Sequence, residues 1–405
     1  MTTNRELVTT GRLAGDALAG MVGTVAHIQR SIAERTFAAV GPAATPARAA
    51  YHGVTNSIYA VVRTVHALAP RLGATVGVIA GKGDERASWS DSARPGWLSA
   101  LNGLRGDQMA ERYPDLAGTM SFRDRVGQDL PMRRNALVAA LPVAGDSIAV
   151  FVHGLCESDR SWWRRAEAHH GDQTSSYGSM LEADLGWTPL HLRYNTGLPV
   201  ADNAQALDQL VTELVDAWPV PVTTIAFIGH SMGGLVVRKA CHDADLAGHS
   251  WTNLVRHVVC LGTPHLGAPL ARGVERIVPP LSRISVTQPL AKVLDDRSAG
   301  VRDLEHGLGT DADLPFLDHA NWTFIGATVT RDRNHPAAHL LGDLLVRYHS
   351  ATGKNREERT TFDLDDTAHI DDTVHIGGID HFDLLNHPQV YAQIAHRLVV
   401  VARSQ

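Results

Sequence analysis

Several features are scarce or missing in this sequence of 405 residues. It has only three cysteines, Cys156, Cys241 and Cys260, an odd number without the paired spacing of a zinc site. A disulfide framework is therefore not expected, and this cysteine content fits a reducing compartment such as the cytoplasm. The histidine-rich segment 366–380 lacks the ligand spacing of a metal site, so neither a metal nor a cofactor is expected.

Long apolar runs are also missing. No run of 18 apolar residues occurs, and the longest candidates, 13–28 and 72–80, are too short or are interrupted by polar residues and glycines. The first residues lack a basic segment followed by an apolar stretch, so no secretory signal peptide is expected. We therefore expect a cytoplasmic protein with no transmembrane segment, which leaves peripheral attachment to a membrane open.

No dense cluster of basic residues occurs, which argues against nucleic acid as a partner. The net charge is −6, but its sign differs along the chain. Residues 1–112 hold twelve Arg or Lys and eight Asp or Glu, whereas the remainder holds 25 and 35. A weakly basic first part is able to approach either anionic lipid or the acidic remainder of its own chain.

The first part of the chain has a helical pattern. Between residues 4 and 80, apolar residues recur every three or four positions, residues 81–96 have the polarity of a linker, and 97–112 fits one more helix. We expect residues 1–112 to form an N-terminal helical region. Its helices either pack against the rest of the chain or a second copy of it, as in a homo-oligomer, or contact a membrane or lipid-granule surface through residues 1–80.

The second part, residues 113–405, alternates strands with helices. Alternating elements of this kind predict a mostly parallel sheet with helices on both faces. Residues 130–137 fit a strand, although a helix over 136–141 is an alternative. The expected strands are 119–123, 130–137, 147–152, 188–194, 225–228, 255–261, 322–330 and 373–376, and the main expected helices are 202–218 and 390–402.

A strand, a forced turn and a helix follow one another within residues 225–240. Between the apolar strand and the helix lies Gly-His-Ser-Met-Gly, with Ser231 at its centre and Gly229 and Gly233 on either side. A serine at the tip of so sharp a turn is strained, and side chains two residues away would collide across it, so glycine is needed there. This pattern is typical of a serine nucleophile.

The stretch Gly229–Gly234, Gly-His-Ser-Met-Gly-Gly, resembles the nucleophile motif of α/β-hydrolase lipases and esterases. Together with Gly-Thr-Pro-His-Leu-Gly at 262–267 and Arg-Tyr-Asn-Thr-Gly at 193–197, it resembles bacterial relatives of the GPI inositol-deacylase family, over about residues 145–390. The resemblance implies the α/β-hydrolase fold and an ester-cleaving serine hydrolase. It does not carry the substrate over.

The strand 147–152 runs into His153-Gly154-Leu155, a pattern that supplies the second oxyanion donor in many lipases. The first donor is the backbone N–H of the residue after the nucleophile, here Met232. The second is expected to be the N–H of Leu155, so that two donors from two loops meet at one oxygen. For His153 itself we expect a structural hydrogen bond within the loop.

A serine nucleophile needs a histidine and a carboxylate, and in this fold they follow the serine in the order acid, then base. Asp343 follows the strand 322–330 in a Gly-Asp-Leu turn, with Asp332 as the rival acid. His381 follows the last strand and precedes the terminal helix, which is where the base belongs. The rival bases are His265, His375 and His387.

Residues 270–320 interrupt the alternation with helical pieces, at a place where lipases carry a cap over the active site. Taken together, the sequence predicts a serine carboxylic-ester hydrolase, an esterase or lipase, with the triad Ser231, Asp343 and His381. Its substrate would be a small-molecule or lipid ester. The alternatives are an acyltransferase or thioesterase with the same triad, and a lipid-surface or granule-binding protein.

Overall fold

In a computed structural model of the chain, the residues that are described are 96–112, 119–268, 298–308, 314–335, 338, 342–353 and 370–402. The predicted helices of residues 4–80 and most of the predicted cap lie outside these residues. The division of the chain at residue 112, the lipid contact and the oligomer therefore stay predictions. Within the described ranges, no helix combines the length and the apolar character needed to cross a membrane.

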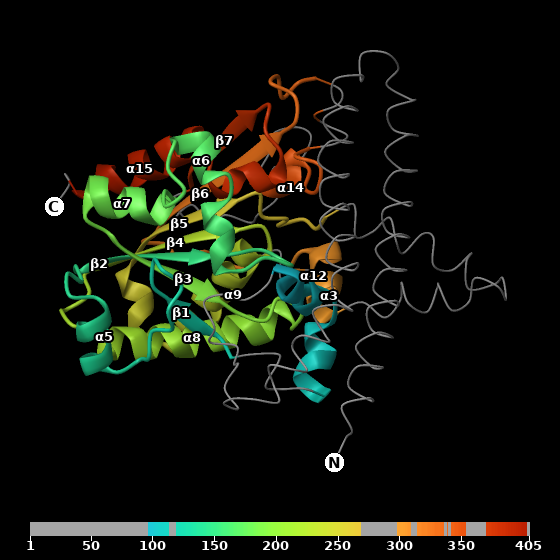
Figure 1. The fold of residues 1–405 in the computed structure, drawn as a ribbon. Helices are drawn as coiled ribbons and strands as arrows, with labels where there is room; N and C mark the ends of the chain where they lie inside the picture. The colour runs from blue at the N-terminus through green and yellow to red at the C-terminus, as the bar shows by residue number, and fades with distance from the viewer. Residues whose placement is uncertain are drawn as a thin grey trace, which may run out of the picture. The chain divides into compact units, whose positions relative to one another are not determined.

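A seven-stranded sheet with the order β1-β3-β2-β4-β5-β6-β7 forms the centre of the described part (Figure 1). β1 pairs antiparallel with β3, and every other neighbouring pair is parallel. This is the strand arrangement of the α/β-hydrolase fold, so the predicted fold class is confirmed. The strands are β1 (Ser121–Arg123), β2 (Ser147–Val152), β3 (Thr188–Arg193), β4 (Thr224–His230), β5 (Val255–Leu261), β6 (Asn321–Thr328) and β7 (Ile370–Gly377).

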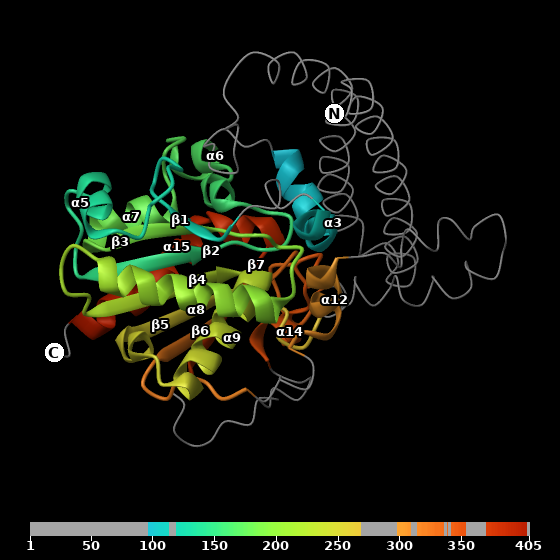
Figure 2. The same ribbon diagram turned by 90° about the horizontal axis from the view of Figure 1, so that it is seen from below.

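Helices cover both faces of this sheet (Figures 1 and 2). The α-helices are α3 (Gly96–Arg112), α5 (Arg134–Ala140), α6 (Ala166–His170), α7 (Tyr177–Leu185), α8 (Val200–Ala217), α9 (Met232–Ala247), α12 (Ala299–His306), α14 (Tyr348–Thr352) and α15 (Pro388–Ala402). Short 3₁₀ helices are η2 (Asp159–Trp163), η3 (Ser250–Leu254) and η5 (His381–Leu385).

The two faces bury different side chains, because neighbouring residues of a strand point to opposite sides. In β2, Val150 and Val152 belong to the core shared with α8 and α9, whereas Phe151 belongs to the core shared with α7 and α15. A strand covered on both faces has no solvent side, which is why β2 is apolar after Ser147 and β5 is apolar over its last four residues, 258–261.

One element was predicted wrongly. Residues 130–137, expected as a strand, contain the start of helix α5, in agreement with the helical alternative. Leu137 is fully buried, and the Arg134 guanidinium donates to the carbonyl oxygens of Trp218 (2.8 Å) and Pro219 (2.5 Å). These contacts attach the short helix to the end of α8 and do not extend the sheet.

Helix α3 lies against loops at the carboxyl ends of the strands. Asn102 Oδ1 accepts a hydrogen bond from the Thr196 N–H (2.9 Å), and the Asn195 side chain donates to the Gly106 carbonyl oxygen (2.9 Å). A Cβ at Gly103 would lie 2.4 Å from the Cys156 sulfur, so only glycine allows this approach. α3 thus supports the loop that follows β2 and the loop that follows β3.

Candidate active site

The turn between β4 and α9 carries Ser231. Its backbone has φ 52° and ψ −123°, a conformation that costs a non-glycine residue of order 1–3 kcal/mol and persists only where the surroundings enforce it. The Ser231 N–H donates to the Leu261 carbonyl oxygen (2.8 Å), and α9 begins at the next residue. A Cβ at Gly233 would lie 2.2 Å from the Val152 carbonyl oxygen, which explains the glycine after the turn. The strain turns Ser231 out of the strand direction.

Asp343 and His381 meet at the carboxyl ends of β6 and β7. His381 Nδ1 lies 2.7 Å from Asp343 Oδ2, and the two side chains are 3% and 1% exposed. The other carboxylate oxygen, Oδ1, accepts from the backbone N–H groups of Leu345 (3.0 Å) and Val346 (2.7 Å). Leu344, between Asp343 and these two donors, has φ 88°, and this left-handed residue turns the chain back toward the carboxylate. The Asp343 carboxylate is therefore held in one orientation toward the ring.

The pair lies beside the Ser231 turn. Leu261 accepts the Ser231 N–H, and a Cβ at the next residue, Gly262, would lie 3.1 Å from the His381 ring atoms Cε1 and Nδ1. The ring of His230, which precedes Ser231, lies 4.7 Å from the ring of His381, centroid to centroid. Within the described ranges, the Ser231 hydroxyl and the His381 ring form no hydrogen bond with each other, although the adjacent residues Leu261 and Gly262 each approach one of them.

The surroundings of His381 shift its pKa. Burial of the ring alone lowers the pKa, but the charge of Asp343 and the hydrogen bond to it favour the protonated ring, as does the charge of Glu157. The net effect is that the pKa of His381 is raised above its ordinary value of 6.5. A histidine that accepts a proton from a neighbouring hydroxyl becomes an imidazolium, and a nearby carboxylate stabilises that charged ring.

Leu155 follows β2, and Met232 follows Ser231. Among the residues that the structure describes, neither of their backbone N–H groups donates to an acceptor. A Cβ at Gly154 would lie 2.9 Å from Ser231 Cβ, so the loop after β2 touches the Ser231 turn. Both N–H groups thus belong to segments that border Ser231, and their role as oxyanion donors stays a prediction.

The loop after β2 is fixed at several points. The Tyr194 hydroxyl donates to the His153 carbonyl oxygen (2.7 Å), and the Cys156 N–H donates to Thr196 Oγ1 (3.2 Å). His153 Nδ1 lies 3.0 Å from the Gly154 carbonyl oxygen, a hydrogen bond within the loop. Tyr194 and Thr196, which follow β3, therefore anchor the loop that carries Leu155.

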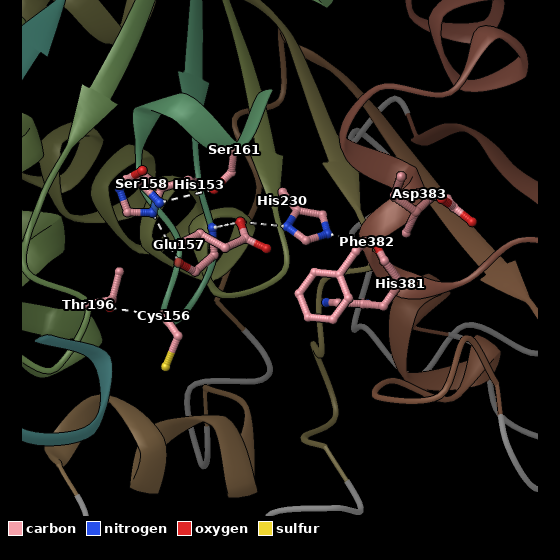
Figure 3. A network of polar contacts seen from close by, with 12 residues as sticks. His153, Cys156, Glu157, Ser158, Ser161, Thr196, His230, His381, Phe382 and Asp383 are labelled. Carbon is pink, nitrogen blue, oxygen red and sulfur yellow. Dashed lines mark hydrogen bonds and ion pairs between the residues drawn. The ribbon is translucent and has the colours of Figure 1, made fainter. Parts of the chain in front are cut away.

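Two residues that the sequence analysis did not assign a role connect this loop to the rest of the site (Figure 3). Glu157 Oε2 accepts from the Gly154 N–H (2.7 Å) and lies 3.0 Å from His230 Nδ1. His230 Nε2 lies 3.0 Å from the His381 carbonyl oxygen. The only signal in the sequence was a glutamate three residues after the His-Gly pair, together with a histidine directly before Ser231.

The rival residues of the sequence analysis lie elsewhere. Asp332 is exposed and accepts from the Asn334 N–H (2.9 Å) in its own turn. His375 Nε2 lies 2.8 Å from Thr328 Oγ1, and the His265 ring packs edge-on against Phe324, where burial holds its pKa well below the ordinary value. It is the Asp343 carboxylate, and not that of Asp332, that meets the His381 ring.

Among the described residues, no group of three or more His, Cys, Asp or Glu side chains has the arrangement to hold a metal ion. The three cysteines are unpaired with one another. Burial raises the pKa of the Cys156 thiol to about 12, with the Glu157 charge acting in the same direction. The Cys156 thiol next to the site is thus protonated at neutral pH.

Comparison with known proteins places residues 146–277 in a family whose model is described as "PGAP1-like alpha/beta domain". This segment holds β2 to β5 and the Ser231 turn. No curated protein matches the chain. Similar solved structures include the mature lipase BlEst2 of Bacillus licheniformis, 18% identical, covering 62% of this chain and 91% of that chain with a TM-score of 0.41.

Two further solved structures are a metagenomic carboxyl esterase and the phospholipase PlaB of Legionella pneumophila. The esterase is 17% identical and covers 64% of this chain and 76% of its own, with a TM-score of 0.37. The phospholipase is 20% identical, and the match covers 51% of this chain and 46% of the phospholipase chain, with a TM-score of 0.33. Residues 146–277 thus match the PGAP1-like alpha/beta domain, and the strand arrangement is that of the α/β-hydrolase fold.

Proposed function

We propose that the protein is a serine carboxylic-ester hydrolase in which Ser231 is the nucleophile, His381 the general base and Asp343 the residue that orients it. The observation that supports this most strongly is the 2.7 Å hydrogen bond between His381 and Asp343, buried beside a strained serine turn. A buried His–Asp pair next to a strained serine has the geometry that acyl transfer requires.

The proposed reaction has two halves. His381 Nε2 takes the proton of the Ser231 hydroxyl as Oγ bonds to the ester carbonyl carbon, and the N–H groups of Leu155 and Met232 donate to the oxyanion. The C–O bond to the alcohol then breaks, and the alcohol leaves with the proton from His381. Water attacks the resulting acyl-Ser231 with the same base, which releases the acid and restores the serine.

The proposed substrates are acyl or lipid-like esters, a class supported by the family match and by the lipase, esterase and phospholipase among the similar structures. The first test is turnover of p-nitrophenyl esters with acyl chains of two to sixteen carbons by the full chain. A fluorophosphonate probe, with the labelled peptide located by mass spectrometry, identifies the nucleophile. Turnover together with labelling of Ser231 is the expected result, and the chain-length optimum separates esterase from lipase.

The same experiment addresses the alternatives. Acyl transfer to an added alcohol that exceeds hydrolysis would make the protein an acyltransferase, and a preference for acyl thioesters over oxygen esters would make it a thioesterase. Folded protein without turnover and without labelling contradicts the proposed function. Lipid binding by such an inactive protein would favour the lipid-surface alternative.

The pH dependence of kcat/KM follows from the raised pKa of His381. Only the neutral ring accepts the proton of Ser231, so activity rises as the pH increases through this pKa. Because the pKa is raised, half-maximal activity on the acid side is expected above about 6.5, the ordinary histidine value. A pH profile of the wild type in constant-ionic-strength buffers measures this, and a midpoint well below 6.5 would contradict the assignment.

A further inference from the structure

We propose that Glu157 and His230 are a positioning pair that holds the loop of Leu155 against the nucleophile turn and ties both to the loop of His381. This inference rests on the proposed function, because the loop is taken to supply an oxyanion donor. The pair connects three segments that are distant in sequence, namely the loop after β2, the end of β4 and η5 (Figure 3). Neither side chain belongs to the proposed triad.

The hydrogen bonds of His230 limit where its protons lie. The His381 carbonyl oxygen only accepts, so His230 Nε2 carries a proton. The 3.0 Å contact between Glu157 Oε2 and His230 Nδ1 needs one further proton, which the two groups share. The pair is therefore neutral as a whole, in a site where His230 is fully buried.

The pair has two consequences for an oxyanion next to Ser231. Glu157 occupies the N–H of Gly154 and leaves the following N–H, that of Leu155, for the oxyanion. A lone carboxylate at this place would repel a developing negative charge, whereas Glu157 and His230 are neutral as a pair. The loop needs such a fastening, because Cys156 has φ 62°, a conformation that a cysteine adopts only when its surroundings hold it.

The experiment compares Glu157→Ala, Glu157→Gln and a matched control in the full chain, with p-nitrophenyl esters as the probe. Glu157→Ala is expected to lower kcat about a hundredfold, the scale of losing one oxyanion donor. KM is expected to change little, because the oxyanion forms only after binding. The control is His249→Ala, which breaks another His–carboxylate pair (His249 Nδ1 to Asp208 Oδ1, 2.7 Å) at the opposite ends of the strands, and its kinetics should equal those of wild type.

Glu157→Gln tests the hydrogen bond to the loop apart from loss of the side chain. One glutamate oxygen, Oε2, contacts both the Gly154 N–H and His230 Nδ1, and a glutamine carbonyl oxygen at that place still accepts from Gly154. This variant should therefore retain most of the kcat that Glu157→Ala loses.

A merely structural role of Glu157 would reduce the amount of folded protein and leave the kcat of the folded fraction unchanged. The kcat of folded Glu157→Ala, and its rescue in Glu157→Gln, therefore distinguish positioning from folding.

Three results would overturn the pair: wild-type kcat in Glu157→Ala, a loss that falls on KM alone, or a kcat of folded Glu157→Gln as low as that of Glu157→Ala. If the wild type hydrolyses no ester, the proposed function fails separately. Two-dimensional ¹⁵N–¹H spectra of the histidine rings, with His230 assigned by a His230→Gln variant, then test the pair alone: a proton on His230 Nε2 and a changed Nδ1 signal in Glu157→Gln support it, and an unchanged Nδ1 signal overturns it.

Discussion

Ser231→Ala is expected to hydrolyse p-nitrophenyl esters about a million-fold more slowly than wild type, the loss that follows removal of the nucleophile from a triad that acts as a unit. Without Oγ no acyl-enzyme forms, and His381 and the two N–H groups have only water to act on. The residual rate should exceed that in buffer, since the oxyanion donors remain. Steady-state kinetics at pH 8 measure the loss, and the burst of p-nitrophenol from the acylation step should disappear.

This variant should fold like the wild type. The Ser231 side chain makes no hydrogen bond among the described residues, and alanine keeps the Cβ that borders Gly154. Circular dichroism and a thermal melt check this. Ser147→Ala, at the opposite end of β2 where the hydroxyl contacts Asp146 (3.0 Å), is the matched control and should keep wild-type activity. Activity of Ser231→Ala within tenfold of wild type would refute the assignment of the nucleophile.

Much of the fold is predictable from apolar runs. β2 and β5 begin and end at the residues expected, because a short run of four or more apolar residues, bounded by polar turns and rich in valine, favours a strand buried on both faces. The strand prediction for residues 130–137 was wrong for a physical reason. In so short a segment the strand period of 2 residues and the helix period of 3.6 residues are hard to separate. The helix is held by Arg134, whose hydrogen-bond partners lie 84 and 85 residues away in the sequence.

Some residues of the candidate site can also be predicted from local patterns, and others cannot. Ser231 and Leu155 can be predicted, because each follows a strand that runs into a glycine-containing turn. Asp343 and His381 are distant from both, and only the order of elements in the fold brings them into consideration. Their contact itself, across 38 residues, needed the structure.

The bond between Glu157 and His230 could not have been foreseen. It spans 73 residues and depends on the left-handed backbone of Cys156, which brings the glutamate round to the end of β4. No local sequence pattern predicts this turn, because cysteine rarely adopts a left-handed backbone conformation and no glycine stands at that position. Polar groups that meet through an unusual backbone conformation are the part of a site that sequence patterns do not encode.

Asp343→Asn is expected to lower kcat by about 10⁴-fold, with the active site otherwise intact. The reason lies in the second carboxylate oxygen. The N–H groups of Leu345 and Val346 both point at Oδ1, so the oxygen of an asparagine should stay with these two donors and its NH₂ group should face His381. An NH₂ that donates to Nδ1 leaves the proton on Nε2, and this tautomer cannot accept the proton of Ser231.

The pH profile separates this explanation from loss of the fold. Removing the Asp343 charge takes away the strongest influence that raises the pKa of His381, so the acid limb of the residual activity should move to lower pH. The His381 backbone still donates to the carbonyl oxygen of residue 343 (2.9 Å in the wild type), which keeps the loop in place. Asp332→Asn, in the exposed turn after β6, is the matched control and should keep both rate and profile. If instead Asp332→Asn lost activity and Asp343→Asn did not, Asp332 would be the acid, and the His381–Asp343 hydrogen bond would serve only to fasten two loops.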